Sequence, residues 1–364
     1  MKTWKISLYI AAAAVLSACS DGTRSLSPAD SLIADLQTSA GEGKILFGHQ
    51  DAYMYGHSWR ASSKDSLDRT DVKDVCGQHP AVLGLDLGGI EFLNLKNLDG
   101  NPFGFMREAA LRHCAEGGVV TLSWHPRNPL TGGDSWDVSS DKVVASVLDG
   151  GGKHDEFMQW LSNCADYLDT FRNDDGELIP LIFRPWHEHT GSWFWWGQKL
   201  CTPDQYRQLW KMTYDYMAAE RGLDNLVWAF SPGADLGDEE YMTRYPGDDM
   251  VDMLGLDCYQ YGELPASNET YVAQLRARLS LMTELGREHG KLTALTETGC
   301  EGVPYEKWWT EVLYPAIEAY PIAYVLVWRN ACDMPGHFYA PWPGQESEAD
   351  FKEFAAHDDI IMLE

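Results

Sequence analysis

Two glutamates in this sequence have surroundings that suit acid–base chemistry. Glu188 follows an apolar run at residues 178–183, which predicts a short buried strand, and four consecutive aromatic residues follow at 193–196. Glu297 directly follows a second apolar run at residues 292–296. A carboxyl group beside flat aromatic rings suits a sugar, because the rings pack on apolar pyranose faces and the acid can protonate a glycosidic oxygen. Both glutamates are therefore candidate catalytic residues for cleaving a glycosidic bond.

Each glutamate alone also fits a purely structural role. Glu188 could cap a helix beside a buried aromatic patch, and Glu297 could be a surface cap before Gly299. A retaining glycosidase, however, needs two carboxyl groups about 5 Å apart, one to protonate the leaving oxygen and one to attack the anomeric carbon. The pairing of two strand-end acids favours the catalytic interpretation.

Strand-like and helix-like runs alternate along the chain. Eight apolar runs predict strands at residues 44–48, 81–87, 118–124, 178–183, 225–230, 251–256, 292–296 and 322–328. Amphipathic runs predict helices at residues 102–116, 155–171, 203–221, 271–289, 305–320 and 347–357. This alternation predicts an α/β fold that is a single (β/α)₈ TIM barrel. An open doubly wound sheet is the alternative, but residues 47–50 lack its usual glycine-rich phosphate loop.

A barrel of this kind carries its chemistry at the carboxyl ends of its strands. Glu188 and Glu297 end the fourth and seventh predicted strands, which face each other across the barrel mouth. The other polar and aromatic residues at strand ends are His49, Gln50, Asp86, Trp124, His125, Arg184, His187, Asp257, Tyr259, Trp328 and Arg329. The barrel prediction therefore gathers acids, histidines and aromatic rings in one cleft.

The motifs at these strand ends resemble glycoside hydrolase family 26, from about His49 to Arg329. The resemblance rests on RPWHE at 184–188, GSWFWWG at 191–197, GLDCY at 255–259 and TE at 296–297. Most members of that family are β-mannanases, in a clan of barrels whose acid/base and nucleophile lie on strands four and seven. The resemblance implies a retaining hydrolase of β-1,4-mannosidic bonds in mannan, galactomannan or glucomannan, with Glu188 as acid/base and Glu297 as nucleophile.

The same resemblance, together with side-chain chemistry, implies roles for the residues around the two glutamates. Tyr259 would donate a hydrogen bond to Glu297, and Asp257 would line the site of the cleaved sugar. Trp328 would be the platform under that sugar, and Arg329 would reach the next unit on the non-reducing side. The remaining predicted substrate-binding residues are Trp193, a platform on the leaving-group side, His125, and His187, a donor to the nucleophile or to a sugar hydroxyl.

His187 and His189 flank Glu188, a pattern that suggests a metal site. On an extended strand the two histidines point one way and the glutamate the other, unlike a zinc-binding helix with histidines at i and i+4. Retaining hydrolysis also needs no metal. The sequence therefore predicts neither a metal nor a cofactor.

The first residues predict export and a lipid anchor. Lys2 and Lys5 precede an apolar stretch at 6–16 that is too short to span a bilayer, and residues 16–19 (LSAC) resemble a bacterial lipobox. We expect a lipoprotein signal peptide at 1–18, lipidation of Cys19, a tether at 19–28 and a catalytic barrel at 29–364. An ordinary signal peptide is the alternative. The expected location is the envelope of a Gram-negative bacterium, in the periplasm or on the outer-membrane surface.

Charge and cysteine content restrict the partners. The chain has 28 Lys and Arg against 55 Asp and Glu, a formal net charge of −27. Such a surface repels phosphate backbones, which argues against nucleic acid and favours a neutral or cationic ligand. Mannan and manno-oligosaccharides are neutral and are the expected partners. The cysteines form no Cys-x-x-Cys pair, so neither a zinc nor a redox motif is indicated. We expect a monomer.

Three alternatives to an endo-acting mannanase stay open. A member of the same family could release mannobiose from chain ends, since the long connection at residues 128–152 could wall off the cleft. A few members act on β-glucan or β-xylan. The choice of sugar depends on which residues contact its 2-hydroxyl, and a single sequence does not show this. A non-catalytic glycan-binding lipoprotein would keep the aromatic residues but would need neither glutamate.

Overall fold

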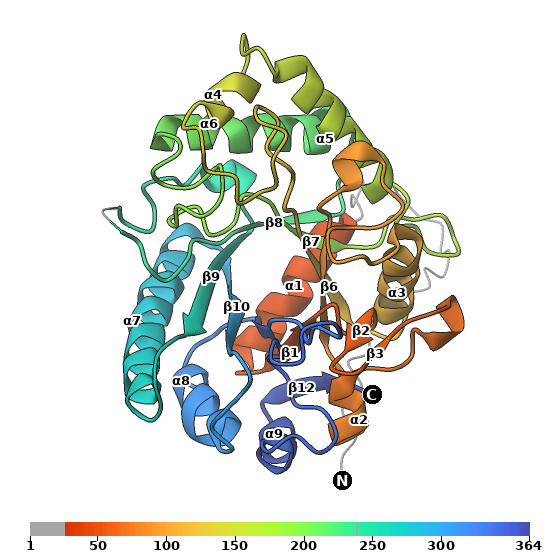
Figure 1. Cartoon of the computed structure of the whole chain (residues 1–364), viewed down its shortest axis with the longest axis vertical. Coiled ribbons are helices and arrows are strands. Elements are labelled where there is room, and N and C mark those ends of the chain that lie inside the picture. The colour runs from red at the N-terminus through yellow and green to blue at the C-terminus, as the bar shows by residue number, and fades with distance from the viewer. Residues whose placement is uncertain (1–25, 238) are drawn as a thin grey trace, which may run out of the picture.

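Eight parallel strands form a closed barrel in this computed structural model, which describes residues 26–237 and 239–364 (Figure 1). β11 pairs with β1 in parallel and closes the barrel. The prediction of a (β/α)₈ barrel is confirmed, and each predicted strand overlaps an observed one. In order around the barrel the strands are β1 (Ile45–Gln50), β5 (Val82–Asp86), β6 (Val119–Ser123), β7 (Leu181–Arg184), β8 (Leu226–Phe230), β9 (Met253–Gln260), β10 (Leu292–Cys300) and β11 (Tyr324–Val327).

Helices follow most of the strands and cover the outside of the barrel (Figure 1). The predicted helices correspond to α3 (Phe103–Ala115), α5 (His154–Leu168), α6 (Pro203–Tyr214), α7 (Ala266–His289), α8 (Tyr314–Ile317) and α9 (Glu348–Ala355). Single π-helical turns extend α6 through Asp215–Glu220 and precede α8 at Trp309–Leu313. Two shorter helices, α2 (Asp71–Cys76) and α4 (Val143–Val147), lie in connections where the sequence indicated no helix.

One further helix, α1 (Pro28–Gly41), closes the amino end of the barrel and was not predicted. It starts at the last residue of the predicted tether, with the Ser27 side chain capping its first turn. Its apolar side chains Leu32 and Leu36 are buried against residues that begin the barrel strands, among them Leu46, Val119, Met253 and Leu292. The helix therefore fills the end of the barrel opposite the predicted cleft.

Short strands outside the barrel were also not predicted. β12 (Ile360–Leu363) pairs in parallel with the start of β1 and antiparallel with β4 (His79–Pro80). β2 (Tyr55–Gly56) and β3 (Trp59–Arg60) form a hairpin just after β1. The strands β2, β3 and β4 have two residues each, too few to show a periodic pattern, which explains why these three were not predicted.

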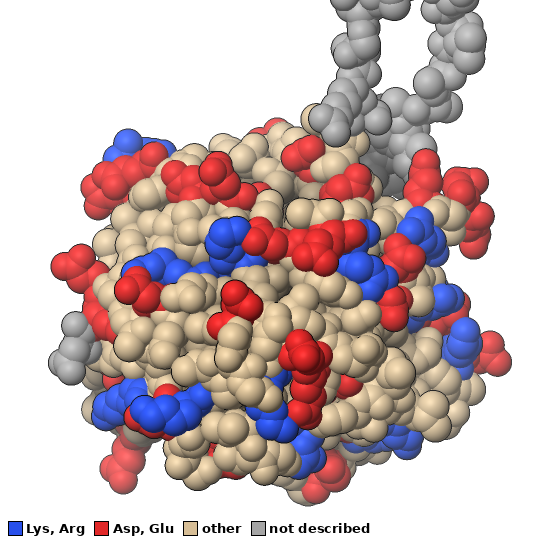
Figure 2. Space-filling model, turned by 90° about the horizontal axis from the view of Figure 1, so that it is seen from above, with Lys and Arg blue, Asp and Glu red and all other residues tan. Residues whose placement is uncertain are grey.

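The described part of the chain does not test the predicted lipid anchor at Cys19. Between residues 26 and 364, leaving out residue 238, no helix combines the length and apolarity needed to cross a bilayer. The seven cysteines in this part of the chain are free. Acidic and basic side chains are interspersed on the face shown in Figure 2. The predicted signal peptide and lipidated Cys19 lie outside the described residues.

Candidate active site

Glu188 and Glu297 lie in one cleft at the carboxyl ends of the strands, with a volume of about 690 Å³. One oxygen atom of each glutamate and one of Asp257 lie within 4.8 Å of one another. Carboxyl groups at this distance are close enough for one to attack a sugar while the other protonates the leaving oxygen. Eight predicted site residues line the cleft: His125, His187, Glu188, Trp193, Asp257, Tyr259, Glu297 and Trp328.

The backbone around Glu188 has an uncommon conformation. Trp186 and Glu188 both lie in the left-handed region, with φ of 55° and 51°, where a residue other than glycine costs about 1–3 kcal/mol. Two hydrogen bonds hold this turn: the Glu188 N–H donates to the Ser231 carbonyl and the Trp196 indole N–H donates to the His187 carbonyl, both at 2.8 Å. The turn brings Glu188 back to the cleft after β7 has ended.

A β-bulge positions Glu297. The register between β10 and β9 shifts between Leu295 and Glu297, so that Thr296 has no partner of its own on β9. A bulge inserts one residue, bends its strand and redirects the side chains that follow. Thr296 is used nonetheless, because its hydroxyl donates to Asp257 at 2.6 Å. The bulge thus directs the Glu297 side chain into the cleft, while the Thr296 side chain bonds the neighbouring strand β9.

Arg184 and Tyr259 hold the Glu297 carboxylate from two sides. The guanidinium of Arg184 donates to Oε1 of Glu297 and, at 2.8 Å, to Asp257. The Tyr259 hydroxyl donates to Oε2 of Glu297 at 2.7 Å. Burial and the negative charges of Glu297 and Glu188 hold the pKa of Tyr259 well above its usual range, so the phenol keeps its proton and remains a donor. The carboxylate that would attack the sugar is therefore fixed in direction.

Glu188 has a different environment, because within residues 26–237 and 239–364 no cation is bonded to its carboxyl group. The Trp193 indole N–H donates to Glu188 at 2.8 Å. Burial and the nearby charge of Glu297 raise the pKa of Glu188 to about 7, although Trp193, Arg184 and His125 act in the opposite direction. Glu188 thus carries a proton in weakly acidic solution, as a general acid requires, while Glu297 is held by charged and hydroxyl donors.

The cluster of three carboxylates could also suggest a bound cation, since oxygens this close can coordinate a metal. Arg184 already supplies a positive charge to Asp257 and Glu297, and the remaining oxygen of each accepts a hydroxyl hydrogen bond from Thr296 or Tyr259. The His189 ring packs between Tyr206 and Phe230, away from these carboxylates. The donor set therefore fits an arginine-neutralised acid pair better than a metal centre.

Two of the histidines that line the cleft, His125 and His187, contact each other. Nε2 of His187 lies 3.1 Å from Nε2 of His125, and Nδ1 of His125 lies 2.5 Å from Asp86. The structure thus pairs His187 with His125, whereas the sequence suggested a bond to the nucleophile or to a sugar hydroxyl. Asp86 and Arg184 were noted at strand ends, but neither was assigned a role in the site from the sequence.

Aromatic rings line the rest of the cleft. Trp193 was predicted there and is 43 % exposed, which leaves a face free for a ligand. The predictions missed four further rings, those of Trp136, Phe194, Tyr261 and Tyr339. Tyr261 lies two residues beyond Tyr259, a spacing that places both on one face of an extended chain and could have indicated it. Trp136 comes from the long connection after β6.

Among the residues that the structure describes, Arg329 is the one predicted substrate-binding residue that does not line this cleft. Its guanidinium pairs with Asp99 at 3.2 Å and donates to the Tyr55 hydroxyl at 3.2 Å. Tyr55 belongs to the β2–β3 hairpin, which the sequence did not predict. Arg329 is therefore tied to the barrel rim beside Trp328, outside the part of the site that holds the glutamates.

The comparison with protein families agrees with this geometry. The model described as glycosyl hydrolase family 26 matches residues 24–314. This chain belongs to glycosyl hydrolase family 26. The family prediction made from the sequence motifs is thereby confirmed.

Solved structures of family 26 proteins superpose closely on the chain. A β-mannanase from Bacteroides ovatus is 47 % identical, with a TM-score of 0.88 over 92 % of this chain and 95 % of that one. The catalytic domain of an endo-β-1,4-mannanase from a Bacillus species is 33 % identical, with a TM-score of 0.83 over 93 % and 92 %.

Curated family 26 relatives carry the same kind of name. A mannan endo-1,4-β-mannosidase from Bifidobacterium adolescentis is 31 % identical over 90 % of this chain and 34 % of its own length. One from Bacillus subtilis is 33 % identical over 63 % of this chain and 65 % of its own length. The chain thus spans about a third of the first of these relatives and less than two thirds of the second.

We predict that Glu297→Gln lowers the pKa of Glu188 below about 7, because it removes the negative charge that disfavours ionisation of its neighbour. The measurement is the titration of ¹³C-labelled glutamate carboxyl groups by NMR. Glu301→Gln is the matched control, since Glu301 is exposed and the same charge is removed outside the cleft. An unchanged pKa of Glu188 in Glu297→Gln would show that the two carboxyl groups do not interact.

Proposed function

We propose that this family 26 chain is a mannan endo-1,4-β-mannosidase, which hydrolyses β-1,4-mannosidic bonds of mannan, galactomannan or glucomannan. The observation that carries the proposal is the pair of carboxyl groups within 4.8 Å, one of them with a pKa raised to about 7 and the other held by Arg184 and Tyr259. The names of the family relatives support mannan as the substrate. A negative chain also suits a neutral polysaccharide.

In the first half of the reaction, Glu297 attacks the anomeric carbon while Glu188 gives its proton to the leaving glycosidic oxygen. The bond from the anomeric carbon to that oxygen breaks, and a covalent ester to Glu297 forms. Tyr259 and Arg184 hold the attacking carboxylate in place until the bond is made. The short distance between the two carboxyl groups favours this double displacement over direct attack by water, which needs a wider gap.

In the second half, Glu188 acts as a base. It takes a proton from a water molecule, and the oxygen of that water attacks the anomeric carbon and releases Glu297. Burial still raises the pKa of Glu188 at this stage, but the ester carries no negative charge, so the repulsion by Glu297 that also raised it is absent. Glu188 can therefore remain ionised until it accepts the proton, and one residue serves both steps.

The remaining cleft residues would bind the sugar chain. Trp328 would lie under the sugar that is cleaved, and Trp193, whose indole also bonds Glu188, would carry the leaving-group side. Asp257 is fixed by Arg184 and Thr296 and would accept hydrogen bonds from sugar hydroxyls. Arg329 would meet the next sugar on the non-reducing side. A binding protein without activity would not need two carboxyl groups with such different environments.

We expect Glu188→Ala to abolish nearly all hydrolysis of galactomannan but to spare substrates with activated leaving groups, which need little protonation. Glu297→Ala should lose both activities, because no nucleophile remains. Release of reducing sugar and of an aryl leaving group measures the two. Glu301→Ala, an exposed acid outside the cleft, is the control. Normal turnover of an aryl mannoside by Glu297→Ala would remove Glu297 from the role of nucleophile.

The double displacement predicts retention of configuration at the anomeric carbon. Proton NMR recorded during the first minutes of hydrolysis should therefore show the β-anomer before mutarotation forms the α-anomer. An α-anomer at the start would mean direct attack by water and a wider carboxyl separation in the working enzyme.

Products distinguish endo from exo action. The connection at residues 128–152 supplies Trp136 to the cleft wall, so it does reach the substrate path. For endo cleavage we expect mannohexaose to give a range of oligosaccharides and galactomannan to lose viscosity early. Mannobiose as the main first product would indicate cleavage from a chain end. Faster hydrolysis of β-glucan or β-xylan than of mannan would overturn the assignment of the sugar.

We also propose that the chain is a lipoprotein with Cys19 as its anchor and a monomer in the envelope. The support is the sequence at residues 16–19, and a tether of a few residues would then lead to α1. Cells fed a labelled fatty acid should label the protein, and Cys19→Ser should abolish the label and release the protein from membranes. A label that persists in Cys19→Ser would disprove anchoring at that residue.

A further inference from the structure

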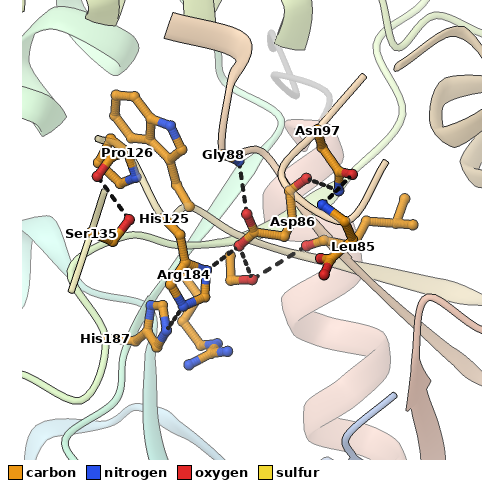
Figure 3. Close-up of polar contacts among 12 residues, drawn as sticks. Leu85, Asp86, Gly88, Asn97, His125, Pro126, Ser135, Arg184 and His187 are labelled. Carbon is orange, nitrogen blue, oxygen red and sulfur yellow. Dashed lines mark hydrogen bonds and ion pairs between the residues drawn. The ribbon is translucent and has the colours of Figure 1, made fainter. Parts of the chain in front are cut away.

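A buried chain of three polar side chains leads from the barrel wall to the cleft (Figure 3). Asp86 ends β5 and its Oδ2 lies 2.5 Å from Nδ1 of His125, which follows β6. Nε2 of His125 lies 3.1 Å from Nε2 of His187, which follows β7. All three side chains are buried, and both histidines line the cleft. No role in the reaction described above requires Asp86.

Asp86 is held as a negative charge. Its Oδ2 also accepts from the Ser123 hydroxyl, and its Oδ1 accepts from the Gly88 N–H, both at 2.7 Å. A Cβ atom at Gly88 would lie only 2.7 Å from the His125 carbonyl oxygen and 2.9 Å from Oδ1, so this close approach needs glycine. Burial raises the pKa of Asp86, but His125 and these donors together lower it.

The contact between the two Nε2 atoms allows two arrangements of protons. His125 faces a carboxylate with Nδ1 and carries a proton there. If His125 is neutral, its Nε2 is bare and His187 must donate to it, which leaves Nδ1 of His187 without a proton. If His125 is positively charged, its Nε2 donates, His187 accepts, and the proton of His187 is on Nδ1.

Charges in the site favour the second arrangement. Burial lowers the pKa of His125, but Asp86 and Glu297 raise it overall, against the opposing charge of Arg184. Burial, Arg184 and His125 hold the pKa of His187 well below its usual range. Of the two rings, His125 is thus the one that favours an extra proton, and His187 favours the neutral form.

The aromatic rings around His125 also favour its positively charged form. The Trp136 ring stacks on the imidazole at 5.3 Å between centroids and 14° between planes, and Phe194 lies edge-on at 5.1 Å. A cation over an aromatic face is stabilised by the ring quadrupole. The stacked tryptophan therefore favours the charged form of His125 and also limits its contact with solvent.

We propose that Asp86 is a positioning residue that keeps His125 positively charged and, through it, fixes the Nδ1–H of His187 as a hydrogen-bond donor to the sugar at the point of cleavage. Nδ1 of His187 is buried without a partner in the described part of the chain, although the side chain lines the cleft. The oxygen of a sugar hydroxyl would accept the hydrogen bond that this Nδ1–H lacks. That a sugar is the acceptor rests on the proposed function, whereas the arrangement of protons on His125 and His187 does not rest on it.

Histidine NMR tests the proton arrangement directly. In protein labelled with [¹⁵N]histidine, long-range ¹H–¹⁵N correlations distinguish charged imidazole from each neutral tautomer. At pH 7 we expect His125 to carry protons on both nitrogens and His187 to carry one on Nδ1 only. The signals are assigned from those lost in His125→Gln and His187→Gln. A neutral His125 in the unmodified protein, with the proton of His187 on Nε2, would overturn the proposal whatever the variants do.

Asp86→Asn removes the charge but keeps the size and an acceptor for Gly88. It should make His125 neutral and lower kcat/KM for mannohexaose about 10²-fold, as expected for losing one aligned donor in the transition state. Ser123→Ala is the matched control, because it removes a hydrogen bond to Asp86 but none to His125, and it should retain most activity and the charged His125 signal.

The outcomes separate the proposal from the proposed function. A charged His125 and normal kcat/KM in folded Asp86→Asn would show that Asp86 only shapes its turn, which overturns its role. Unmodified protein that does not hydrolyse mannan would disprove both the proposed function and the sugar as acceptor, while the NMR spectrum would still decide the proton arrangement. Hydrolysis of mannan with a neutral His125 would remove the positioning role alone.

Discussion

The arrangement of the site depends on one buried guanidinium. Arg184 ends β7 and bonds Asp257 from β9 and Glu297 from β10, so a single side chain joins three strands at the barrel mouth. Removing charges from water is costly, and such a group is stable only when its partners are close and well aligned. Without Arg184, the two carboxylates that face Glu188 would have no cation bonded to them in the described part of the chain. The ion pairs therefore allow three acids to share a small volume.

The rest of the barrel makes this cluster rigid. Its interior is closed at the amino end by α1 and packed with apolar side chains such as Leu46, Ile182 and Leu326. Packing at this density resists displacement of the strands, so their carboxyl ends keep fixed distances. The left-handed turn at Glu188 and the bulge before Glu297 then adjust the two carboxyl groups at the mouth. Strain at these points is tolerated because the surrounding barrel holds them in place.

The alternating strands and helices of the barrel were predicted from the sequence. The eight buried strands stand out as apolar runs and six of the helices as amphipathic runs, and the strand ends can be located from them, so the positions of Glu188 and Glu297 followed. α1 was missed because its apolar positions fall next to a polar segment that was taken as a tether. The β2–β3 hairpin was too short to detect, and with it the partner of Arg329.

Contacts between distant residues were beyond the reach of the sequence for a physical reason. Asp86 and His125 are 39 residues apart, and His125 and His187 are 62 apart, so nothing local indicates that their side chains touch. The bulge at Thr296 depends on how β10 pairs with both neighbours, which a single strand does not reveal. The types of residue in the site were predictable from the strand ends, but their hydrogen-bond partners were not.

The charges of the site remain balanced through the reaction that we propose. Before attack, Glu188 is protonated and Glu297 is ionised; in the covalent ester, Glu297 is neutral and Glu188 has become the carboxylate. One negative charge thus moves between two groups within 4.8 Å of each other, while Arg184 keeps its positive charge and Asp86 its negative charge. A charged His125 faces this pair from the side of β6 and, like Arg184, favours the ionised form of Glu188. The fixed charges thereby serve both halves of the cycle, and little reorganisation is needed between them.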